Sequence, residues 1–497
     1  MHAFSPLFSI AAALFVSAQS VAGTESVNSL SISTPNVRTA AETNSSLTAA
    51  STKQNTSFEK ISNPENQKKI NLDVSLLGIQ YLSVSPADTA FQQKAQVELG
   101  YHNTIQSFDL AVSALAGSFS LPRSSYVALP EAYIGVSSEN HKNYFALGRK
   151  IQNFSFMDRQ LNLGLYDPYF SNDFIEYKEQ GLVGVHTGLQ TSIFGLTAGY
   201  YPYYLPNQGP QVYAESGEIR TSNRWAQKPP DQLQFGSQNR AIVYAIRDYD
   251  LKDIVSNSGY ALSTFLGHSD DRPWIKASYS RKPISEIPLS RDTYGTAVNF
   301  SGQVKLSPVV TYSQTKSLDL NLDNSLFKTT FSYLEDQPEN TVAVDKETLQ
   351  ILEPLKIYGA WFSVDLSNWL GRAVISEVSY SEIYGGKISD LLADGRPSLF
   401  TFSTQRTLFK KPLSFKVQTK LFSILNRPLV TSVKWTYDEF YKGSLLSGLV
   451  KYQALTKMNL NMGFDLLGVE DETANGDHFL KSNQANSRVY GGLDYAF

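Results

Sequence analysis

Apolar and polar residues alternate with a period of two over many short stretches between residues 70 and 497. In 458–466, Met, Leu and Phe occupy every second position, and Asn, Gly and Asp fill the positions between them. This pattern predicts a strand with one apolar and one polar face. Similar stretches occur at 97–101, 108–116, 259–266, 358–366, 374–383, 410–421 and 433–437. The chain is therefore expected to be all-β from residue 70 onward.

Two architectures can bury strands of this kind. A soluble sandwich or propeller packs the apolar faces inward, whereas a transmembrane antiparallel β-barrel turns them to lipid and keeps a polar lumen. Strands of about ten residues and aromatic residues near strand ends favour the barrel. A propeller would show a repeat of roughly 40 to 50 residues, and none is visible. The expected fold is a barrel of about 18 strands, within a range of roughly 16 to 20.

Loops of such a barrel should alternate between short turns at one end and long loops at the other. If 469–486 is a long loop, strict alternation places 335–355 and 384–397 at the short-turn end. Both of these segments are too long for short turns. The strand count along the sequence must therefore have split one strand into two, or merged two strands into one, in this region.

Residues 1–22 are predicted to be an export signal. Their apolar stretch, 7–18, is too short to span a bilayer, and small residues at 20–22 offer a cleavage site before Gly23. No Lys or Arg precedes the apolar stretch, so a buried amino-terminal strand or helix is the alternative.

Residues 23–69 are polar, and Phe58 is their single aromatic residue. Such a segment cannot bury enough apolar surface to offset the entropy of ordering it. It is predicted to be a flexible periplasmic tether, and the alternative is a plug that enters a pore. The expected organisation is a signal peptide at 1–22, a tether at 23–69 and a transmembrane β-barrel at 70–497.

The final stretch alternates as well, and the sequence finishes with Phe497. It resembles the terminal strand of bacterial outer-membrane β-barrel proteins, which are porin-like, although no subfamily can be named. The matching positions are Tyr490, Gly492, Tyr495 and Phe497, and Tyr490 replaces the polar residue that the family prefers. The resemblance implies an assembly signal that the barrel-assembly machinery reads. An edge strand with free backbone groups can pair with a partner sheet before closure.

Composition narrows the chemistry of the chain. A net charge of −3 gives no global field that would recruit nucleic acid. The absence of Cys excludes disulfides, thiol catalysis, cysteine-ligated metals and an acylated lipoprotein terminus. The six His residues show no metal-ligand spacing, and no hydrolase or nucleotide-binding motif occurs. We therefore expect no metal, no cofactor and no enzyme activity.

The segment 149–181 stands out because it is long and combines aromatic with charged residues. Long loops in compact folds are usually functional. It is a candidate pore constriction, formed by Arg149, Lys150, Asp158, Arg159, Asp167, Asp173 and Glu176. The alternatives are an external loop packed on its own aromatics, or two short strands. A second long segment, 202–240, is equally compatible with an external lid.

Taken together, the sequence predicts an outer-membrane porin-like channel for passive diffusion of small hydrophilic solutes. The alternative is a structural or adhesive barrel with a closed lumen and partner-binding external loops. An active transporter is disfavoured because a folded plug has no room before residue 70. Expected partners are outer-membrane lipid, the barrel-assembly machinery, small hydrophilic solutes and, for a homotrimer, other copies. Lys416, Lys420 and Lys434 should face the lumen, opposite Phe415, Leu421 and Trp435.

Overall fold

The structure is a computed structural model, and all of the residues it describes belong to one compact unit, Gln54–Phe497. It describes residues 70–497 except for 84–89, 121–123, 139–142, 210–211, 222, 227–230, 236–237, 249, 268–273, 297–300, 325, 341–346, 372, 392–404 and 471–477. The predicted signal at 1–22 and the predicted tether at 23–69 lie outside the described residues.

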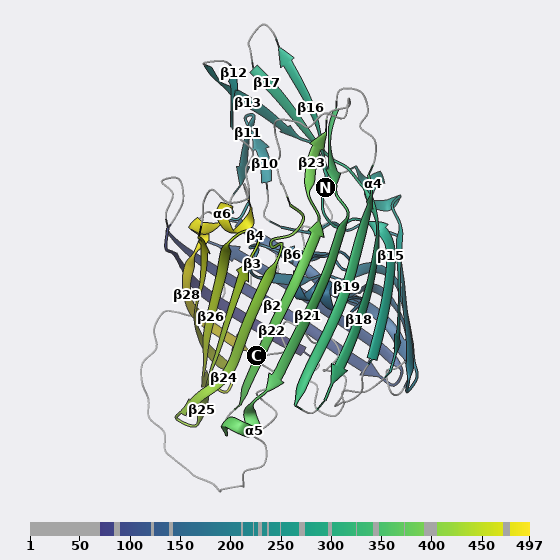
Figure 1. Ribbon diagram of the computed structural model, residues 1–497, viewed down its shortest axis with the longest axis vertical. Coiled ribbons are helices and arrows are strands. Elements are labelled where there is room, and N and C mark those ends of the chain that lie inside the picture. Colours follow the sequence, from purple (N-terminus) through teal and green to yellow (C-terminus); the bar gives the residue numbers. More distant parts are fainter. Residues whose placement is uncertain are drawn as a thin grey trace, which may run out of the picture. The chain divides into compact units, whose positions relative to one another are not determined.

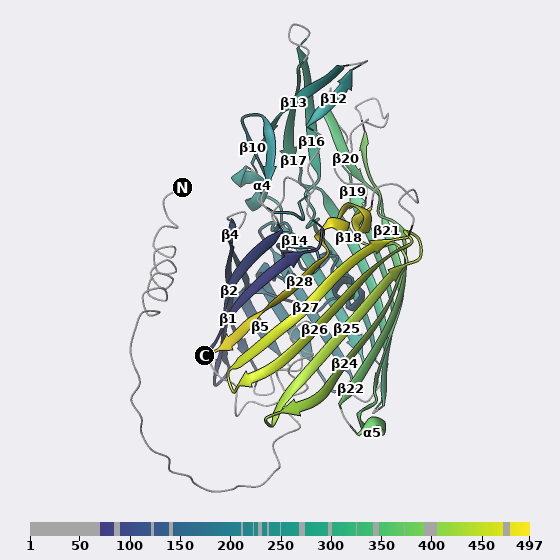
Figure 2. The same cartoon turned by 90° about the vertical axis from the view of Figure 1, so that its left-hand side faces the viewer.

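An antiparallel sheet of 18 strands forms the main body and closes on itself as a barrel (Figures 1 and 2). Each strand pairs with the next one in the series, and β28 pairs with β1. The all-β barrel and its strand number confirm the prediction. The strands are β1 (Ile70–Tyr81), β2 (Phe91–Ile105), β3 (Phe108–Phe119), β4 (Ser124–Ser137), β5 (Tyr144–Lys150), β8 (Leu182–Gln190), β9 (Phe194–Tyr201), β14 (Gly259–Leu266), β15 (Trp274–Pro283), β18 (Tyr312–Asp323), β19 (Phe327–Glu339), β21 (Leu355–Asp365), β22 (Val374–Gly385), β24 (Pro412–Ile424), β25 (Arg427–Asp438), β26 (Gly443–Leu455), β27 (Met458–Val469) and β28 (Arg488–Ala496).

The alternation sorts side chains to the two faces of the barrel. Phe415 pairs with Trp435, and both are exposed on the outer face, at 44% and 39%. One position along, Lys416 pairs with Lys434 on the inner face, and the Lys416 ammonium lies 3.1 Å from Glu377. The predicted inward direction of these two lysines therefore agrees with the register. A register shift follows Lys420, where β24 departs from simple alternation.

Short turns join the strands at one end of the barrel, which we call the short-turn end. In the turn after β24, Leu425 and Asn426 take positive φ values of 52° and 62°, typical of a tight hairpin. The other end, the long-loop end, carries long connections, among them 151–181, 202–258, 284–311, 340–354, 386–411 and 470–487. The sequence count that placed 335–355 and 384–397 at the short-turn end was therefore wrong. An even number of strands separates the three segments that it compared, so all three lie at the long-loop end.

Several long connections form additional sheets at the long-loop end (Figure 1). A six-stranded sheet follows the order β12 (Gln232–Phe235), β13 (Gln238–Ile246), β17 (Ser301–Pro308), β16 (Leu289–Thr296), β20 (Glu347–Leu352) and β23 (Ile388–Leu391). A hairpin of β10 (Val212–Glu215) and β11 (Glu218–Thr221) packs against it through Ile219, Ile242 and Leu306. The segment 202–240, which by sequence was equally compatible with an external lid, contributes to both.

Helices are short in the part of the chain that the structure describes. They are α3 (Phe156–Gln160), α4 (Leu251–Val255), α5 (Ser367–Leu370), α6 (Phe479–Ser482) and the 3₁₀ turn η3 (Gln484–Asn486). Among the described residues, no helix has the length and apolar character needed to cross a membrane.

Candidate functional site

The connection 151–181 folds inside the barrel, and we call it the inserted segment. It contains α3 and a small hairpin of β6 (Tyr169–Ser171) and β7 (Tyr177–Glu179). Ser155 caps α3 by accepting a hydrogen bond from the backbone N–H of Asp158 at 3.4 Å. The segment leaves β5, crosses to the opposite wall, and returns to β8.

One side of the inserted segment packs on the wall opposite its attachment. The backbone N–H of Phe156 donates to the Asp319 carboxylate on β18 at 2.9 Å, and the Phe156 ring lies 5.4 Å from Trp361 on β21. Met157 fills the space above Gly359, where an added Cβ would meet its methyl group at 2.0 Å. A side chain at 359 would therefore displace the Met157 methyl group from this position.

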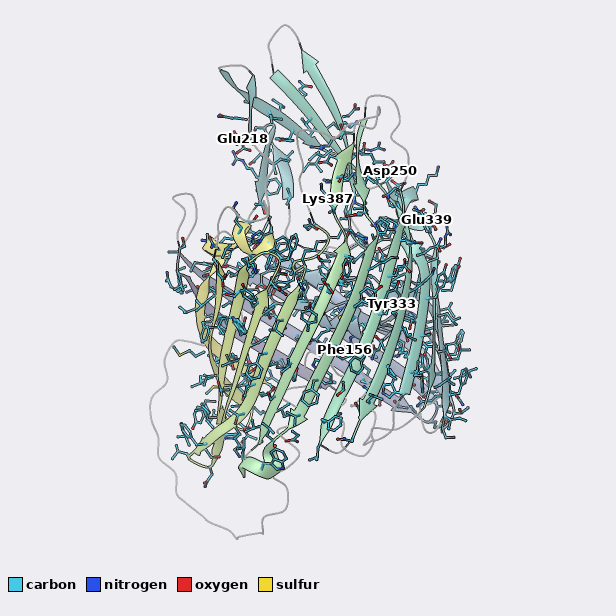
Figure 3. The ribbon with its side chains drawn as sticks, viewed as in Figure 1. Phe156, Glu218, Asp250, Tyr333, Glu339 and Lys387 are labelled. Atoms are coloured by element: carbon cyan, nitrogen blue, oxygen red, sulfur yellow. The ribbon has the colours of Figure 1, made fainter. Side chains whose placement is uncertain are left out.

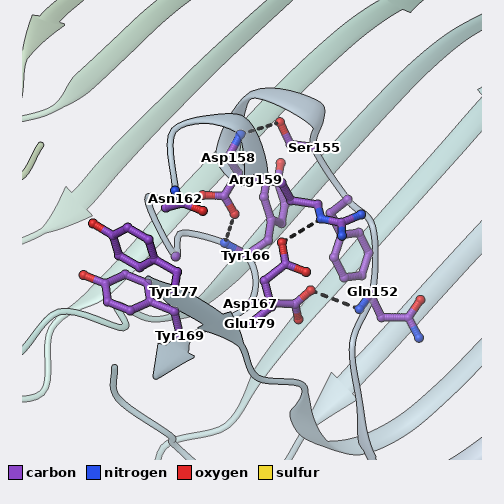
Figure 4. Close-up of a pocket in the computed structure, with 12 residues that line it drawn as sticks. Gln152, Ser155, Asp158, Arg159, Asn162, Tyr166, Asp167, Tyr169, Tyr177 and Glu179 are labelled. Carbon is purple, nitrogen blue, oxygen red and sulfur yellow. Dashed lines mark hydrogen bonds and ion pairs between the residues drawn. The ribbon is translucent and has the colours of Figure 1, made fainter. Parts of the chain in front are cut away.

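Asp158 organises the interior of the inserted segment (Figure 4). Its two carboxylate oxygens accept the backbone N–H groups of Leu165 and Tyr166, each at 2.9 Å. Burial raises the pKa of Asp158 to about 6, although these two hydrogen bonds oppose the shift. The Tyr166 hydroxyl donates to the Ser278 carbonyl at 3.2 Å and so ties the same turn to β15.

Asp167 lies on the other side of a small cavity within the segment. One carboxylate oxygen accepts the backbone N–H of Gln152 at 3.0 Å, and the other has no hydrogen-bond partner among the described residues. Burial raises the pKa of Asp167 well above its usual value. The cavity measures about 20 Å³, which is room for about one water molecule.

The β6–β7 side of the segment makes ion pairs with the opposite part of the barrel. Lys178 pairs with Glu98 on β2 at 2.6 Å, and Glu176 pairs with Lys94 on the same strand at 2.6 Å. The charges of Lys94 and then of Arg488 hold the pKa of Glu176 below its usual value.

Two further pairs complete this charged set. Asp173 accepts the Arg488 guanidinium of β28 at 2.9 Å, and Arg488 also pairs with Asp465 of β27 at 2.8 Å. Within the segment, Arg159 pairs with Glu179 at 2.7 Å. Five of the seven predicted constriction residues, Asp158, Arg159, Asp167, Asp173 and Glu176, therefore lie on the inserted segment inside the barrel.

The remaining two predicted residues, Arg149 and Lys150, end β5 and do different things. Arg149 is buried and donates to the Gly181 carbonyl at 2.8 Å and to the Gln180 side chain, so it fastens the return of the segment. Lys150 lies with its ammonium 3.9 Å from the centre of the Tyr133 ring.

The inner surface of the barrel has two contrasting parts. The packed wall is the inner face of β14, β15, β18, β19, β21 and β22, and the inserted segment covers it. Asp319, Leu334 and Ile357 have no exposed surface there, and Phe154 and Met157 of the segment are 1% exposed. Polar inner groups on this wall are bonded to the segment, as when Ser278 donates to the Phe154 carbonyl.

The accessible wall is the inner face of β24 to β28, β1 and β2. Three of its charged side chains keep contact with solvent: Lys451 is 32% exposed, Glu98 31% and Asp494 26%. Lys451 lies 3.3 Å from Asp494, and the amide of Asn461 donates to the same carboxylate at 2.6 Å. Solvent therefore reaches these three inner side chains.

Sequence reasoning missed Lys94, Glu98 and Arg488 as partners of the inserted segment. Lys94 and Glu98 occupy polar positions of the stretch that becomes β2, so the alternation could have pointed to them. No sequence signal links Arg488 to Asp173, because 315 positions separate them. Within the described ranges of 70–497, no group of three or more His, Asp or Glu side chains could hold a metal ion.

The predicted assembly residues divide between the two faces of β28. Tyr495 and Phe497 point outward with their rings 4.7 Å apart, and Phe497 also donates its backbone N–H to Leu72 at 2.9 Å. Tyr490 and Gly492 lie on the inner register. A Cβ at 492 would lie 1.9 Å from the Leu76 carbonyl, so close pairing with β1 requires glycine there.

Among known proteins, only solved structures resemble this chain, and a porin is among them. No protein-family model and no curated protein matches the chain. The chain is similar to OccAB3 of Acinetobacter baumannii, with 10% identity, a TM-score of 0.42, and coverage of 86% of this chain and 98% of that one. It is also similar to OccK11 (OpdR) of Pseudomonas aeruginosa. The identity is 8%, the TM-score is 0.44, and the match covers 86% of this chain and 95% of that one. A third similar structure is a BenF-like porin from Pseudomonas fluorescens Pf-5. The identity is 9%, the TM-score is 0.43, and the match covers 86% of this chain and 97% of that one.

Proposed function

We propose that the chain is a porin-like channel that spans a bacterial outer membrane and lets small hydrophilic solutes diffuse through it. The observation that carries the proposal is the accessible wall, where charged side chains inside a closed barrel keep contact with water. A barrel whose interior served only as a packed core would bury such groups or exclude them.

The outer face supports placement in a membrane. Near the short-turn end, exposed aromatic side chains are Phe108, Phe145, Phe194, Phe327, Phe362, Phe422 and Phe497. Toward the long-loop end they include Tyr200, Tyr260, Tyr358, Tyr380 and Tyr384. Two aromatic rows that flank an apolar band are typical of barrels in lipid, because these rings favour the membrane interface. A water-soluble protein rarely exposes so much contiguous apolar surface.

Charged residues on the outer face fit the same placement. On β19, Tyr333 lies within the aromatic row and Glu339 lies further toward the long-loop end (Figure 3). Arg281 of β15 holds Glu339 through two contacts of 2.7 and 2.8 Å. We infer that the membrane surface runs between Tyr333 and Glu339 on this side, with the long-loop end external.

The inserted segment is proposed to narrow the passage to the part beside the accessible wall. It covers the packed wall and presents Glu176, Lys178 and Glu179 toward the remaining space, with side-chain exposures of 46%, 35% and 27%. These groups are the proposed constriction, together with Glu98 of β2 across from them.

Single-channel recording in planar bilayers tests the proposal. The purified barrel should give discrete, ohmic conductance steps in KCl. A variant in which a short Gly-Ser linker replaces 154–178 should conduct several-fold more, because the obstruction is gone. Folded barrel that stays electrically silent, with heat-modifiable migration as the check of folding, would contradict the proposal.

The alternative function, a closed barrel whose external loops bind a partner, draws support from the six-stranded sheet at the long-loop end. This sheet contains a buried ion pair between Arg291 and Asp390 at 2.6 Å, a sign of a specifically organised loop region. Silence in bilayers for both the intact and the shortened protein would favour this alternative.

Export, assembly and oligomeric state complete the proposal. Residues 1–22 would be removed before Gly23, which amino-terminal sequencing of the outer-membrane form would test.

Replacing Phe497 with Asp should lower outer-membrane yield if the barrel-assembly machinery reads the terminal strand. The matched outward substitution Phe422→Asp should lower it less, because it leaves that strand intact. Native gels would distinguish a monomer from a homotrimer.

A further inference from the structure

Residues 223–226, which we call the strap, reach from the connection between β9 and β14 to the opposite side of the long-loop end. The Asn223 side-chain amide donates to the Asn172 carbonyl of the inserted segment at 2.6 Å. The Arg224 guanidinium donates to the Asn486 side chain at 3.1 Å and lies 4.1 Å from the Tyr81 ring. The strap therefore bridges the inserted segment, the last loop and the end of β1.

Trp225 is the apolar anchor of the strap and is only 3% exposed. Its ring lies edge-on to Phe174 of the inserted segment at 6.3 Å and stacks parallel to Phe479 of α6 at 6.5 Å. Leu445 and Leu467 of the barrel wall belong to the same cluster. Trp225 therefore joins its own connection, 202–258, to the connections 151–181 and 470–487, and packs all three against the accessible side of the barrel.

The strap and Arg488 hold the same part of the inserted segment, residues 172–176. Arg488 pairs with Asp173 at 2.9 Å, and its guanidinium lies 5.6 Å from the Trp225 ring. The adjacent Glu176 pairs with Lys94 at 2.6 Å. The position of this tip, which borders the accessible wall, is therefore set jointly by the strap, Arg488 and Lys94.

We propose that the strap is a latch that sets the width of the passage, an inference that rests on the proposed channel function. With Trp225 seated, the tip 172–176 is fixed against β28 and the passage is narrow. When the strap lifts, the tip loses Asn223, Trp225 and the support that Trp225 gives to Arg488, and the passage widens.

The balance of forces makes two populated positions reasonable. The strap is held by one buried indole, by the Arg224 guanidinium over the Tyr81 ring, and by side-chain hydrogen bonds of Asn223 and Arg224. Seating it costs the backbone entropy of ordering about four residues, which exceeds the gain from burying one large side chain and is offset only together with these polar contacts. Opposing contributions of similar size allow both positions to be populated, and a single substitution can then shift the ratio strongly.

Two variants of the full-length barrel test the latch by single-channel recording. Trp225→Ala should raise the time-averaged conductance roughly twofold or more, because the wide position becomes dominant. The double variant Asn172→Cys with Asn223→Cys, in a chain without native Cys, should give a small and quiet conductance after oxidation. Reduction should restore the wild-type record.

Trp369→Ala is the matched control, because Trp369 is 77% exposed on α5 at the short-turn end. It should leave conductance unchanged, and heat-modifiable migration should show that every variant folds. If the wild type conducts and neither strap variant differs from it, the latch is wrong and the channel stands. If the wild type is silent and Trp225→Ala conducts, the latch closes the passage completely. If no variant conducts, the channel function and the latch both fail.

Discussion

The packed wall and the accessible wall are made of strands with the same alternation, yet their inner side chains meet different surroundings. On β18, Asp319 is fully buried and bonded to the Phe156 N–H of the inserted segment and to Ser332. On β28, Asp494 has a similar set of polar partners but remains 26% exposed. The comparison teaches that an inward polar residue can serve either to hold a loop or to line a passage. What decides between these roles is where the inserted segment lies.

A charge placed where the inserted segment contacts the packed wall should have the largest effect. Met157→Asp would put an unpaired carboxylate beside Gly359 and Ser381, where burial without a partner costs several kcal/mol. We expect the inserted segment to detach, which limited proteolysis within 151–181 and a rise in conductance would report. Ser432→Asp, on the accessible wall, is the control and should change stability by less than about 1 kcal/mol. Equal sensitivity of the two variants would remove the distinction between the walls.

The second prediction concerns the pH dependence of the packed side. The pKa of Asp158 is raised by burial to about 6, so the folded segment binds this proton more tightly than the unfolded segment does. Its contribution to stability is therefore fully present below about pH 4 and is lost as pH rises to 6, by roughly 3 kcal/mol. Hydrogen exchange of the Leu165 and Tyr166 amides, corrected for intrinsic rates, measures this loss.

Asp158→Asn is the control for the pH prediction, because an amide oxygen can still accept a hydrogen bond but does not titrate over this range. The exchange of the two amides should then be flat between pH 4 and 6 after correction. A wild-type profile that is also flat would mean that Asp158 titrates as an ordinary carboxyl.

Chemical labelling offers a third way to sharpen the comparison. Cysteines at Lys416, Lys434 and Lys451 should react with a small membrane-impermeant thiol reagent, because these inner positions border water. Cysteines at Ser280 and Ser332, which are also inner positions but lie on the packed wall, should react at least about tenfold more slowly. Outward positions Phe415 and Trp435 should stay unlabelled in lipid. Rapid labelling of Ser280→Cys would show that the packed wall is open to water.

The sequence predicted the regular part of the molecule well, because a barrel repeats one local rule. Alternation identified 259–266, which is β14 in full, and the length of 70–497, at about ten residues per strand plus turns and loops, gave about 18 strands. It miscounted where long connections contain strands of their own, as in 340–354 with β20. Periodicity cannot separate a strand that belongs to the barrel from one in a loop sheet.

The candidate site was only partly predictable for a different reason. The acidic and aromatic composition of 149–181 was enough to single the segment out, but not to say which wall it covers. Its partners, such as Asp319 and Arg488, are inner polar residues like many others on the strands, and they are distant in sequence. In the sequence Arg149 is one more base beside the segment, and only the structure shows that its guanidinium donates to the Gly181 carbonyl.

The smallest effect is expected at the border between the two regions, where Lys178 of the inserted segment pairs with Glu98 of β2. Both side chains are about one-third exposed, at 35% and 31%, so water screens their interaction. Lys178→Ala should lower the stability of the barrel by no more than about 1 kcal/mol, as for other exposed ion pairs. Its effect on ion preference should be easier to detect, because removing a positive charge from the narrow part leaves Glu98 unopposed and favours cations. The reversal potential in a KCl gradient should shift toward cation selectivity, whereas Lys252→Ala, on α4 in the connection 202–258, should leave it unchanged. An unchanged reversal potential for Lys178→Ala would place the narrowest part of the passage elsewhere.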